Sequence, residues 1–468
     1  MPIDAGSMST FDVLVIGSGP AGEKAAFQAA KLRKRVAVVD RDDCLGGNCL
    51  HTATIPSKTL RETIQYIASV KQRSRWGIRT SIDQPITFDM LLRKKNAVID
   101  GQVEMLERKF DRNDVTVIAG EARFVDAHRV EVADPHGGTR LVDADIIMIA
   151  TGSRPARDPS IPFDDRIVYD SDTILLQLHE VPHSLTIVGA GVIGCEYACM
   201  FAALGTKVTL LDTRPRVLDF ADHEMSELLV ARMRDAGVTL RLGEEVASVA
   251  IAGPHRVVAT TRSGKAVVSE KLLYAVGREG NTARLAVERA GLQPGRRGLL
   301  TVNQHFQTAV PHIYAAGDVI GFPSLAATSM HQGRLAMAHA LGVAANGEGA
   351  ALPYGIFTIP ELSMVGETEE QLTSANVPYE MGHAFFREIP RGEIVGDRTG
   401  MLKLLFERES HRLRGVHIIG EKASELIHIG QAVLAFGGPV DYFVEAVFNH
   451  PTLSEAYKVA ALNGLNRL

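Results

Sequence analysis

The chain has little cysteine and no long hydrophobic run. Its 468 residues include four cysteines, namely Cys44, Cys49, Cys195 and Cys199. Four are too few for a secreted scaffold built on disulfides, and no apolar stretch reaches the roughly 18 residues that suggest a membrane span. Residues 1–10 lack the charged and then apolar pattern of a signal peptide. We therefore expect a cytoplasmic protein in which residues 1–10 are either a flexible leader or not native to the protein.

The chain also lacks a strong excess of charge of either sign. Its formal net charge is −5 at pH 7, which provides no overall attraction to nucleic acid or to an anionic membrane. We expect neither as a partner. Apolar residues make up 46% of the chain and charged residues 22%, as in ordinary globular enzymes. A chain of this length is expected to form two to four domains.

A first dinucleotide-binding pattern lies near the N-terminus. The apolar run Phe11–Ile16 predicts a buried strand, and the turn Gly17–Gly22 follows it with the spacing G-x-G-x-x-G. The stretch Glu23–Leu32 predicts a helix, and Arg35–Val39 predicts a second strand that ends at Asp40. In this strand, turn, helix and strand context the glycine pattern is strong evidence for a dinucleotide site.

Each of the three glycines in this turn is favoured for a physical reason. Gly17 permits the tight turn, Gly19 lets a pyrophosphate approach the backbone, and Gly22 lets the helix pack against the strand. The N-terminus of the helix offers free N–H groups to the phosphates. Asp40 is placed to accept hydrogen bonds from a ribose.

The same pattern occurs a second time. The expected strand Ser184–Val188 leads into a turn that contains Gly189, Gly191 and Gly194. A helix over Cys195–Ala203 and a strand over Lys207–Leu211 follow, and Asp212 ends that strand. The interval from first glycine to acid is 23 residues in both copies, 17 to 40 and 189 to 212. Two dinucleotide-binding units in one chain are typical of an enzyme that uses a flavin together with a nicotinamide cofactor.

The remaining pattern predicts an α/β fold with two Rossmann-like dinucleotide-binding domains and an α+β C-terminal domain. Further expected helices cover Pro85–Phe110, a start near Ser324, Glu425–Phe436 and Val440–Val447. Further expected strands lie in Val115–Val132, Ile146–Ala150, Lys271–Val276, Ile313–Ala316, Gly400–Glu407 and Leu413–Gly420. The expected domains are residues 10–155 with 278–349, residues 156–277, and residues 350–468. Cys195 and Cys199 are spaced i, i+4 on an expected buried helix, and we expect no metal site.

A segment beyond the first unit carries a resemblance to a known family. Gly46–Lys58 reads GGNCLHTATIPSK and resembles the active-site segment of the flavoprotein disulfide oxidoreductases, which has the form GG-x-C-x4-C-IPSK. Together with the other motifs, the resemblance covers essentially the whole chain. Cys49 matches the first cysteine, but Thr54 stands at the second. A threonine cannot form a disulfide.

The resemblance implies FAD in the first domain, NAD or NADP in the second, and dimerisation through the third. The implied FAD-binding residues are Gly17, Gly19, Gly22, Asp40, Arg41, Gly46, Gly47, Cys49, Lys58, Ala122, Thr151, Gly152, Asp318 and Ala326. The implied nicotinamide-nucleotide residues are Gly189, Gly191, Gly194, Glu196, Asp212, Arg214, Arg216 and Gly277. The implied catalytic residues are Lys58, Glu196, His450 and Glu455. Lys58 would pair with Glu196, and the His450–Glu455 pair would face the partner subunit of a homodimer or higher homo-oligomer.

Cys44 and Cys49 share the C-x4-C spacing, but they do not match the family's cysteine pair. Aligning Gly46–Gly47 and Ile55–Lys58 with the family pattern places Cys44 before the glycine pair. We therefore expect no redox disulfide between Cys44 and Cys49.

Without the second thiol, the usual exit for electrons is closed. The hydride must then return to a second soluble acceptor, and the nicotinamide site is available for it. The implied reaction is hydride exchange between NADPH and NAD⁺, giving NADP⁺ and NADH. The variant C-x-H-x-x-T-I-P-S-K over Cys49–Lys58 and the C-terminal segment Ala460–Arg467 are similar to the transhydrogenases of this family.

Residues after the second unit favour use of both nucleotides. Asp212 favours NAD through the ribose hydroxyls, whereas Arg214 and Arg216 are suited to a 2′-phosphate. The alternative is that both arginines are solvated loop residues.

Other functions stay open on the sequence alone. One is a dihydrolipoamide dehydrogenase-like disulfide reductase with another thiol, and a second is an NAD(P)H oxidase or quinone reductase with Cys49 as a lone redox thiol. A nucleotide sensor is disfavoured, because it would have little need for the flavin-side set of Lys58, Glu196, Asp318 and His450. His450 is either a general base towards Cys49 or an interface residue.

Overall fold

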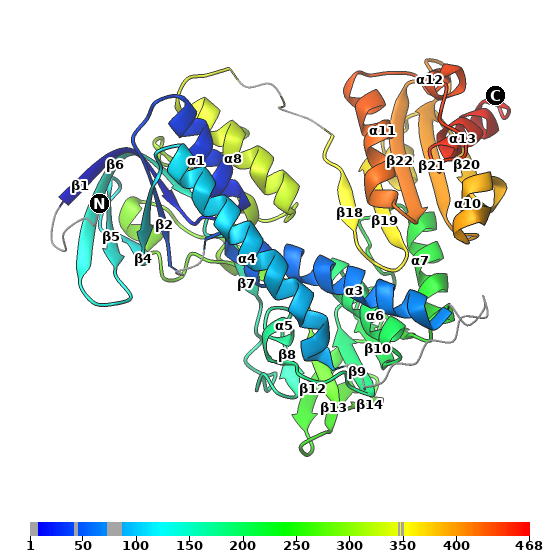
Figure 1. Ribbon diagram of the computed structural model, residues 1–468, viewed down its shortest axis with the longest axis horizontal. Coiled ribbons are helices and arrows are strands. Elements are labelled where there is room, and N and C mark those ends of the chain that lie inside the picture. Colours follow the sequence, from blue (N-terminus) through cyan, green and yellow to red (C-terminus); the bar gives the residue numbers. More distant parts are fainter. Residues whose placement is uncertain (1–7, 42–44, 73–86, 345–346, 348–350) are drawn as a thin grey trace.

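The computed structural model describes residues 8–41, 45–72, 87–344, 347 and 351–468. Cys44 and the expected helix start at Pro85 lie outside these residues. Within them, the strands form three larger sheets, a three-stranded sheet and a two-stranded pair, and β17 returns to the first sheet after the second one is complete (Figure 1). None of the described helices is long and apolar enough to cross a membrane.

The first sheet holds the first glycine turn. Its strands are β1 (Met8–Ile16), β2 (Val36–Asp40), β3 (Thr116–Ala119), β4 (Glu121–Phe124), β5 (Arg129–Ala133), β6 (Thr139–Ile149) and β17 (Ile313–Ala315). The order is β3-β2-β1-β6-β5-β4, and β17 also pairs with β6. Strands β1, β2, β3, β6 and β17 pair in parallel, whereas β4 and β5 add an antiparallel edge. The buried parallel strands are rich in valine and isoleucine, as strands covered on both faces usually are.

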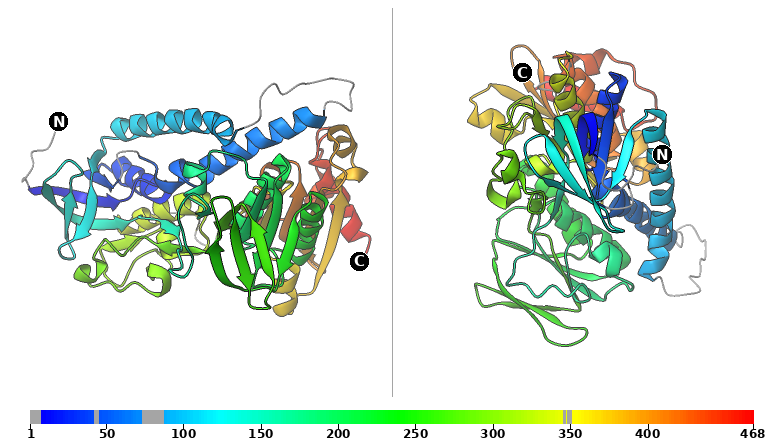
Figure 2. Two further views of the ribbon diagram at one scale, coloured as in Figure 1. Left: turned by 90° about the horizontal axis from the view of Figure 1, so that it is seen from below. Right: turned by 90° about the vertical axis from the view of Figure 1, so that its left-hand side faces the viewer.

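Helices α1 (Pro20–Lys31) and α8 (Ala326–Ala340) pack side by side against this sheet (Figure 1). Their close approach depends on Gly333, where an added Cβ would lie 2.1 Å from the carbonyl oxygen of Ala21. Helix α4 (Phe88–Arg112) lies along the outside of the molecule in both views of Figure 2. It begins one residue after Thr87, whose side chain accepts a hydrogen bond from the Met90 N–H and so caps the helix.

The second sheet holds the second glycine turn. Its parallel strands are β8 (Val168–Tyr169), β9 (Ser184–Val188), β10 (Lys207–Asp212), β11 (Thr239–Leu242) and β15 (Lys271–Tyr274), in the order β11-β10-β9-β15-β8. The accompanying helices are α5 (Ile174–Gln177), α6 (Val192–Leu204) and α7 (His223–Asp235). A separate antiparallel sheet contains β12 (Val246–Ile251), β13 (Val257–Thr261) and β14 (Ala266–Ser269). Cys195 and Cys199 on α6 are buried, as expected.

The third sheet is antiparallel. It contains β18 (Tyr354–Ile356), β19 (Glu361–Gly366), β20 (Tyr379–Phe385), β21 (Met401–Glu407) and β22 (Leu413–Gly420), in the order β18-β19-β22-β21-β20. The helices of this part are α9 (Glu369–Ser374), α10 (Pro390–Val395), α11 (Ala423–Ala435), α12 (Asp441–Glu445) and α13 (Glu455–Leu465). Helix α11 packs on β19 and β22, while α13 packs on β20 and β21. This sheet lies at the right of Figure 1.

Two connections join the first two sheets. The short strands β7 (Ser153–Pro155) and β16 (Arg278–Gly280) pair with each other. Helix α2 (Gly47–His51) leads into α3 (Thr54–Gln72), which contacts α4 and α6. The residues around Cys49 and Lys58 therefore lie where the first two parts of the chain meet.

The structure confirms the expected fold class and corrects several element limits. Met8–Thr10 are not part of a flexible leader, because they extend β1 and pair with β6. Helices α1 and α6 begin inside their glycine turns, at Pro20 and Val192, because the turn backbone enters the helix directly. Helix α12 is shorter than the expected 440–447. The domain limits stay a prediction.

Candidate functional site

A cavity of about 1160 Å³ lies between the two glycine turns and reaches residues of the third sheet. Most single ligands occupy pockets of roughly 300–1,000 Å³, so this cavity is large. The expected site residues that line it are Gly17, Gly19, Asp40, Arg41, Gly47, Cys49, Lys58, Ala122, Thr151, Gly152, Gly189, Gly191, Glu196, Asp212, Arg214, Gly277, Asp318 and Ala326. Those outside the lining are Gly22, Gly46, Gly194, Arg216, His450 and Glu455.

The first glycine turn admits no side chain at two positions. Gly17 has a φ of +104°, and an added Cβ would lie 2.3 Å from the Ala150 carbonyl oxygen. At Gly22 a Cβ would lie 1.9 Å from the Gly17 oxygen, where α1 meets β1. At Gly19 the nearest atom is 4.0 Å away, so the backbone there is open to a ligand. The Asp40 carboxylate fixes the turn by accepting from Ser18 N at 2.7 Å and from Ser18 Oγ at 2.5 Å.

The second turn repeats this construction. Gly189 has a φ of +108°, and an added Cβ would lie 2.5 Å from the Ala275 carbonyl oxygen. At Gly194 it would lie 1.7 Å from the Gly189 oxygen. Asp212 Oδ2 accepts from the Ala190 N–H at 2.5 Å, as Asp40 does from Ser18. The equal 23-residue intervals thus correspond to two turns with the same geometry.

Two polar atoms at the cavity wall fit a polar ligand. The hydroxyl oxygens of Thr52 and Thr151 are buried and have no hydrogen-bond partner within the described part of the chain. Both residues line the cavity. Buried hydroxyls normally have partners, so these two are suited to bind the polar parts of a dinucleotide such as FAD.

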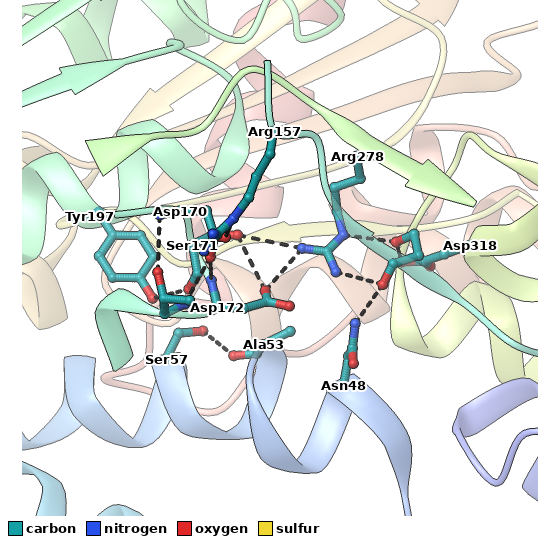
Figure 3. A network of polar contacts seen from close by, with 12 residues as sticks. Asn48, Ala53, Ser57, Arg157, Asp170, Ser171, Asp172, Tyr197, Arg278 and Asp318 are labelled. Atoms are coloured by element: carbon teal, nitrogen blue, oxygen red, sulfur yellow. Dashed lines mark hydrogen bonds and ion pairs between the residues drawn. The ribbon is translucent and has the colours of Figure 1, made fainter. Parts of the chain in front are cut away.

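A hydrogen-bond network centred on Arg278 joins the first two sheets at the cavity (Figure 3). Its Nε donates to Ser153 Oγ at 2.8 Å, and Ser153 Oγ donates to Asp318 Oδ2 at 2.8 Å. On the other side, Arg278 Nη1 lies 3.2 Å from the Asp172 carboxylate. Burial raises the pKa of Asp172, although Arg278 opposes this shift. Asn48 adds a hydrogen bond from Nδ2 to the Ser153 carbonyl oxygen at 2.6 Å.

Lys58 and Glu196 form an ion pair of 2.7 Å across the junction of α3 and α6. The other carboxylate oxygen of Glu196 accepts from the Phe357 N–H at 2.9 Å, and Lys58 Nζ lies 5.1 Å from the centre of the Phe357 ring. The Glu196 side chain is 5% exposed and that of Lys58 is 24% exposed. The ion pair therefore places the Lys58 ammonium at the cavity wall, where it can act on a bound group.

Cys49 is a thiol without a sulfur partner among the described residues. Burial raises the pKa of its thiol, while a hydrogen bond with the Thr54 side chain partly opposes that shift. The protonated thiol is a poor nucleophile. Cys49 thus has the hydroxyl of Thr54 as its hydrogen-bond partner, where the family pattern has a second sulfur.

Arg214 and Arg216 point in different directions. Arg214 forms hydrogen bonds to both carboxylate oxygens of Asp212, from Nε at 3.0 Å and from Nη2 at 2.8 Å. Burial alone would raise the pKa of Asp212, but hydrogen bonds from Arg214 and Ala190 lower it. Arg216 contacts His223 Nδ1 at 3.1 Å and lies 3.8 Å from Glu370. Only Arg214 is at the cavity wall.

His450 and Glu455 form a pair of 2.8 Å between Nδ1 and Oε1, away from the cavity of their own chain. The His450 side chain is 65% exposed. An exposed pair of this kind is available to a second subunit, but it does not reach Cys49 within one chain.

Sequence reasoning missed several cavity residues. Asp172, Ser153, Arg278 and Asp219 line the cavity and make polar contacts there. Three aromatic residues from three different parts of the chain also meet at the wall, with ring centres 5.6–6.2 Å apart, namely Phe220, Phe322 and Tyr354. None of these residues belongs to a glycine pattern, and their proximity depends on how the three parts pack.

A second buried ionic group lies outside the cavity. Lys403 is fully buried and contacts Asp222 at 3.0 Å, Glu224 at 3.1 Å and Glu369. The three carboxylates lie close enough together to resemble a metal site, but the lysine ammonium already provides their positive charge.

Comparison with known proteins agrees with this site. Residues 11–333 match the family profile described as pyridine nucleotide-disulphide oxidoreductase, and residues 352–461 match its dimerisation domain. The chain is 50% identical over 462 residues to the "Soluble pyridine nucleotide transhydrogenase" of Mycobacterium bovis (strain BCG / Pasteur 1173P2), covering 98% of both proteins. It is 46% identical over 463 residues to the protein of that name from Hahella chejuensis, covering 98% of this chain and 99% of the relative.

Two solved structures share the fold over nearly the whole chain. LpdA from Mycobacterium tuberculosis superposes with a TM-score of 0.90 at 27% identity, covering 97% of this chain and 99% of LpdA. The HOCl-induced flavoprotein disulfide reductase RclA from Escherichia coli gives a TM-score of 0.85 at 28% identity, covering 96% of this chain and 99% of RclA. The two glycine turns, the cavity between them and both profile matches lead to one conclusion: this chain belongs to the pyridine nucleotide-disulphide oxidoreductase family.

Proposed function

We propose that the protein is an FAD-dependent transhydrogenase that exchanges hydride between NADPH and NAD⁺. The observation that carries the proposal is Thr54, which contacts Cys49 at the cavity wall where a disulfide reductase needs its second thiol. The relatives named as transhydrogenases at 45–50% identity over 98% of this chain support the same reaction.

Two sets of cavity residues hold the two nucleotides in this proposal. FAD would be held by the first glycine turn, with Asp40 binding a ribose and Thr151 and Asp318 binding its remaining polar groups, and residues 10–155 and 278–349 would form its domain. When bound, FAD supplies a group that accepts a hydride and gives it back. NAD or NADP lies along the second turn, within residues 156–277.

The protein's own residues orient the reaction and protect it from side reactions. The Lys58–Glu196 pair holds a fixed positive charge at the place where α3 and α6 meet and so stabilises negative charge that develops there. Thr54 and the raised pKa of Cys49 keep that side of the cavity free of a thiolate. Hydride therefore leaves by the nicotinamide site through which it entered.

The proposal includes a homodimer formed through residues 350–468. The match of residues 352–461 to the dimerisation domain supports this assembly. The His450 side chain is 65% exposed in the single chain and that of Glu455 is 24% exposed, and in the dimer the pair faces the partner. With no redox disulfide to serve, His450 acts there as an interface residue.

Anaerobic titration with NADPH tests the proposal. We expect the protein to take up one hydride per FAD and to show no thiolate-to-flavin charge-transfer band. Uptake of a second hydride would instead support a disulfide reductase. Steady-state assays with NADPH and an NAD⁺ analogue should give parallel lines in double-reciprocal plots. Rapid turnover with oxygen or a quinone, and slow turnover with the analogue, would replace transhydrogenation by oxidase or quinone reductase activity.

A further inference from the structure

Three of the five N–H groups of Arg214 already bind carboxylates before any nucleotide binds. Its Nε and Nη2 atoms bind Asp212, as described above, and its Nη1 lies 2.7 Å from Asp219 Oδ1. The guanidinium also lies beside the glycine turn, since a Cβ added to Gly191 would be 3.9 Å from Nη2. Arg214 therefore occupies the end of β10, where an adenosine ribose is read in folds of this kind.

Asp219 differs from Asp212 in its surroundings. The Asp212 side chain is 5% exposed and accepts a backbone N–H of the glycine turn, so it is part of the turn itself. The Asp219 side chain is 45% exposed and lines the same cavity. Its hydrogen-bond partner is Arg214. It is thus the partner of Arg214 that an incoming anion can displace.

The charges of the three residues disfavour a phosphate at this place. Asp212 and Asp219 each carry −1 and Arg214 carries +1, so the cluster carries a net −1. A phosphate monoester carries about −1.5 to −2 at neutral pH. Both carboxylates therefore repel a phosphate that approaches Arg214, and Asp219 also accepts an Nη1 hydrogen that the phosphate could otherwise accept. NADH has a ribose hydroxyl at that position and meets no such repulsion.

We propose that Asp219 sets the balance between NADPH and NADH by competing with the 2′-phosphate for the guanidinium of Arg214. This inference rests on the proposed function and deepens it, because an exchange enzyme must release both nucleotides from one site. Asp219 weakens the phosphate-bearing nucleotide selectively, and Arg214 keeps it from being excluded. Asp219 is thus a specificity-determining residue, although it takes no part in the reaction itself.

The test measures the binding of 2′,5′-ADP and 5′-AMP to the FAD-loaded protein by titration calorimetry. In Asp219→Asn, one carboxylate charge is removed while the shape of the side chain is kept. Because Arg214 and Asp219 are both partly exposed, we expect 2′,5′-ADP to bind about two- to fivefold more tightly, with 5′-AMP unchanged. High salt should reduce this difference. Asp219→Ala should act in the same direction.

Two further variants separate competition from a general charge effect. Glu227→Gln removes the same charge from an exposed position of α7 that does not line the cavity, and it should change neither affinity. In an Arg214→Ala background, Asp219→Asn should bring a smaller gain for 2′,5′-ADP than in the native protein, because there is no guanidinium left to release.

The outcomes are distinct from those of the function test. If both ligands tighten equally, or if their affinity ratio does not change in Asp219→Asn, Asp219 is not the selectivity residue. A full gain in the Arg214→Ala background would also overturn competition for the guanidinium. Hydride transfer from NADPH to an NAD⁺ analogue is assayed separately in the wild-type protein. If no transfer is detected, the proposed function is rejected, whatever effect Asp219 has on nucleotide binding.

Discussion

Replacing Thr54 by cysteine should convert the site into one with a redox disulfide. Cys49 and Thr54 are in side-chain contact, one at the centre of α2 and the other at the first residue of α3. A cysteine at position 54 therefore brings a second sulfur next to the first. The variant should accept two hydride equivalents from NADPH per chain, one more than the native protein.

The expected stability change follows from the short loop that such a disulfide closes. Residues 49–54 form a loop of six residues. The chain-entropy relation gives about 2 kcal/mol of stabilisation for a loop of this size at 25 °C. The oxidised variant should therefore unfold at a slightly higher temperature than its reduced form, and the native protein should show no such dependence on reductant.

The assay is an anaerobic NADPH titration followed by a count of free thiols. Thr54→Ser is the matched control, because it keeps the hydroxyl and adds no sulfur; it should take up one hydride, as the native protein does. Thr54→Cys could also take up only one hydride, with thiol counting showing that Cys49 and the new thiol both stay free after oxidation. In that case the second sulfur does not restore the transfer of electrons to a disulfide. The native protein taking up two hydrides would refute the reasoning at its start.

Four further outcomes are expected. Arg214→Ala combined with Arg216→Ala should weaken NADPH more than NADH in titration calorimetry, because a 2′-phosphate loses the guanidinium of Arg214 at the cavity wall; equal loss for both nucleotides would contradict this. Lys58→Met should slow hydride transfer by about tenfold or more in stopped flow while FAD stays bound, since the charge at the cavity wall is lost, and Lys58→Arg should recover part of the rate. Lys403→Met should cost about 3–5 kcal/mol of stability, because Asp222 is left as a buried unpaired charge, and Lys403→Met with Asp222→Asn should recover much of it in chemical denaturation. Burial alone would raise the pKa of Asp222, but His417 and Lys403 lower it. The ionised Asp222 therefore stabilises the fold above its unfolded pKa of about 3.9, and this stabilisation is lost as the pH falls through the lower folded pKa. In acid, the native protein should lose more stability than the double variant.

The glycine turns were predictable from the sequence because their constraints are local. At Gly17 and Gly189 the positive φ and the neighbouring carbonyl oxygen leave no room for a Cβ. A strand, a glycine turn and a helix within about 30 residues are sufficient to specify such a turn. For the same reason, Asp40 and Asp212 were correctly expected at the ends of β2 and β10.

The partners of the charged residues could not be predicted in this way. Arg278 meets Asp172 and Ser153 across more than 100 residues, and no periodicity carries that information. Arg214 and Arg216 are two residues apart, yet only Arg214 reaches the cavity. The direction of each arginine depends on which carboxylate the folded chain places next to it, and for Arg216 that neighbour is Glu370 of α9.

The first turn of α9 links the third sheet to the segment between Arg214 and His223, which follows β10. Glu369 contacts the buried Lys403, which also binds Asp222 at the start of α7. The adjacent Glu370 accepts the His223 N–H at 3.1 Å and lies 3.8 Å from Arg216. Because the buried lysine is expensive to separate from its carboxylates, α9 and the start of α7 are held together.

The contacts between α9 and the start of α7 should influence the selectivity between NADPH and NADH. The segment between Arg214 and His223 is fixed at one end by Asp212 and at the other by a helix of the C-terminal part. Asp219 lies between these two anchors and is the exposed carboxylate that contacts Arg214. Changes at Glu370 should therefore alter NADPH affinity from a different sheet, through Arg216 and the position of the loop, while NADH affinity stays constant. If Glu370→Gln shifted both affinities equally in calorimetry, the contacts between α9 and α7 would support the fold of the segment between Arg214 and His223 without affecting nucleotide selectivity.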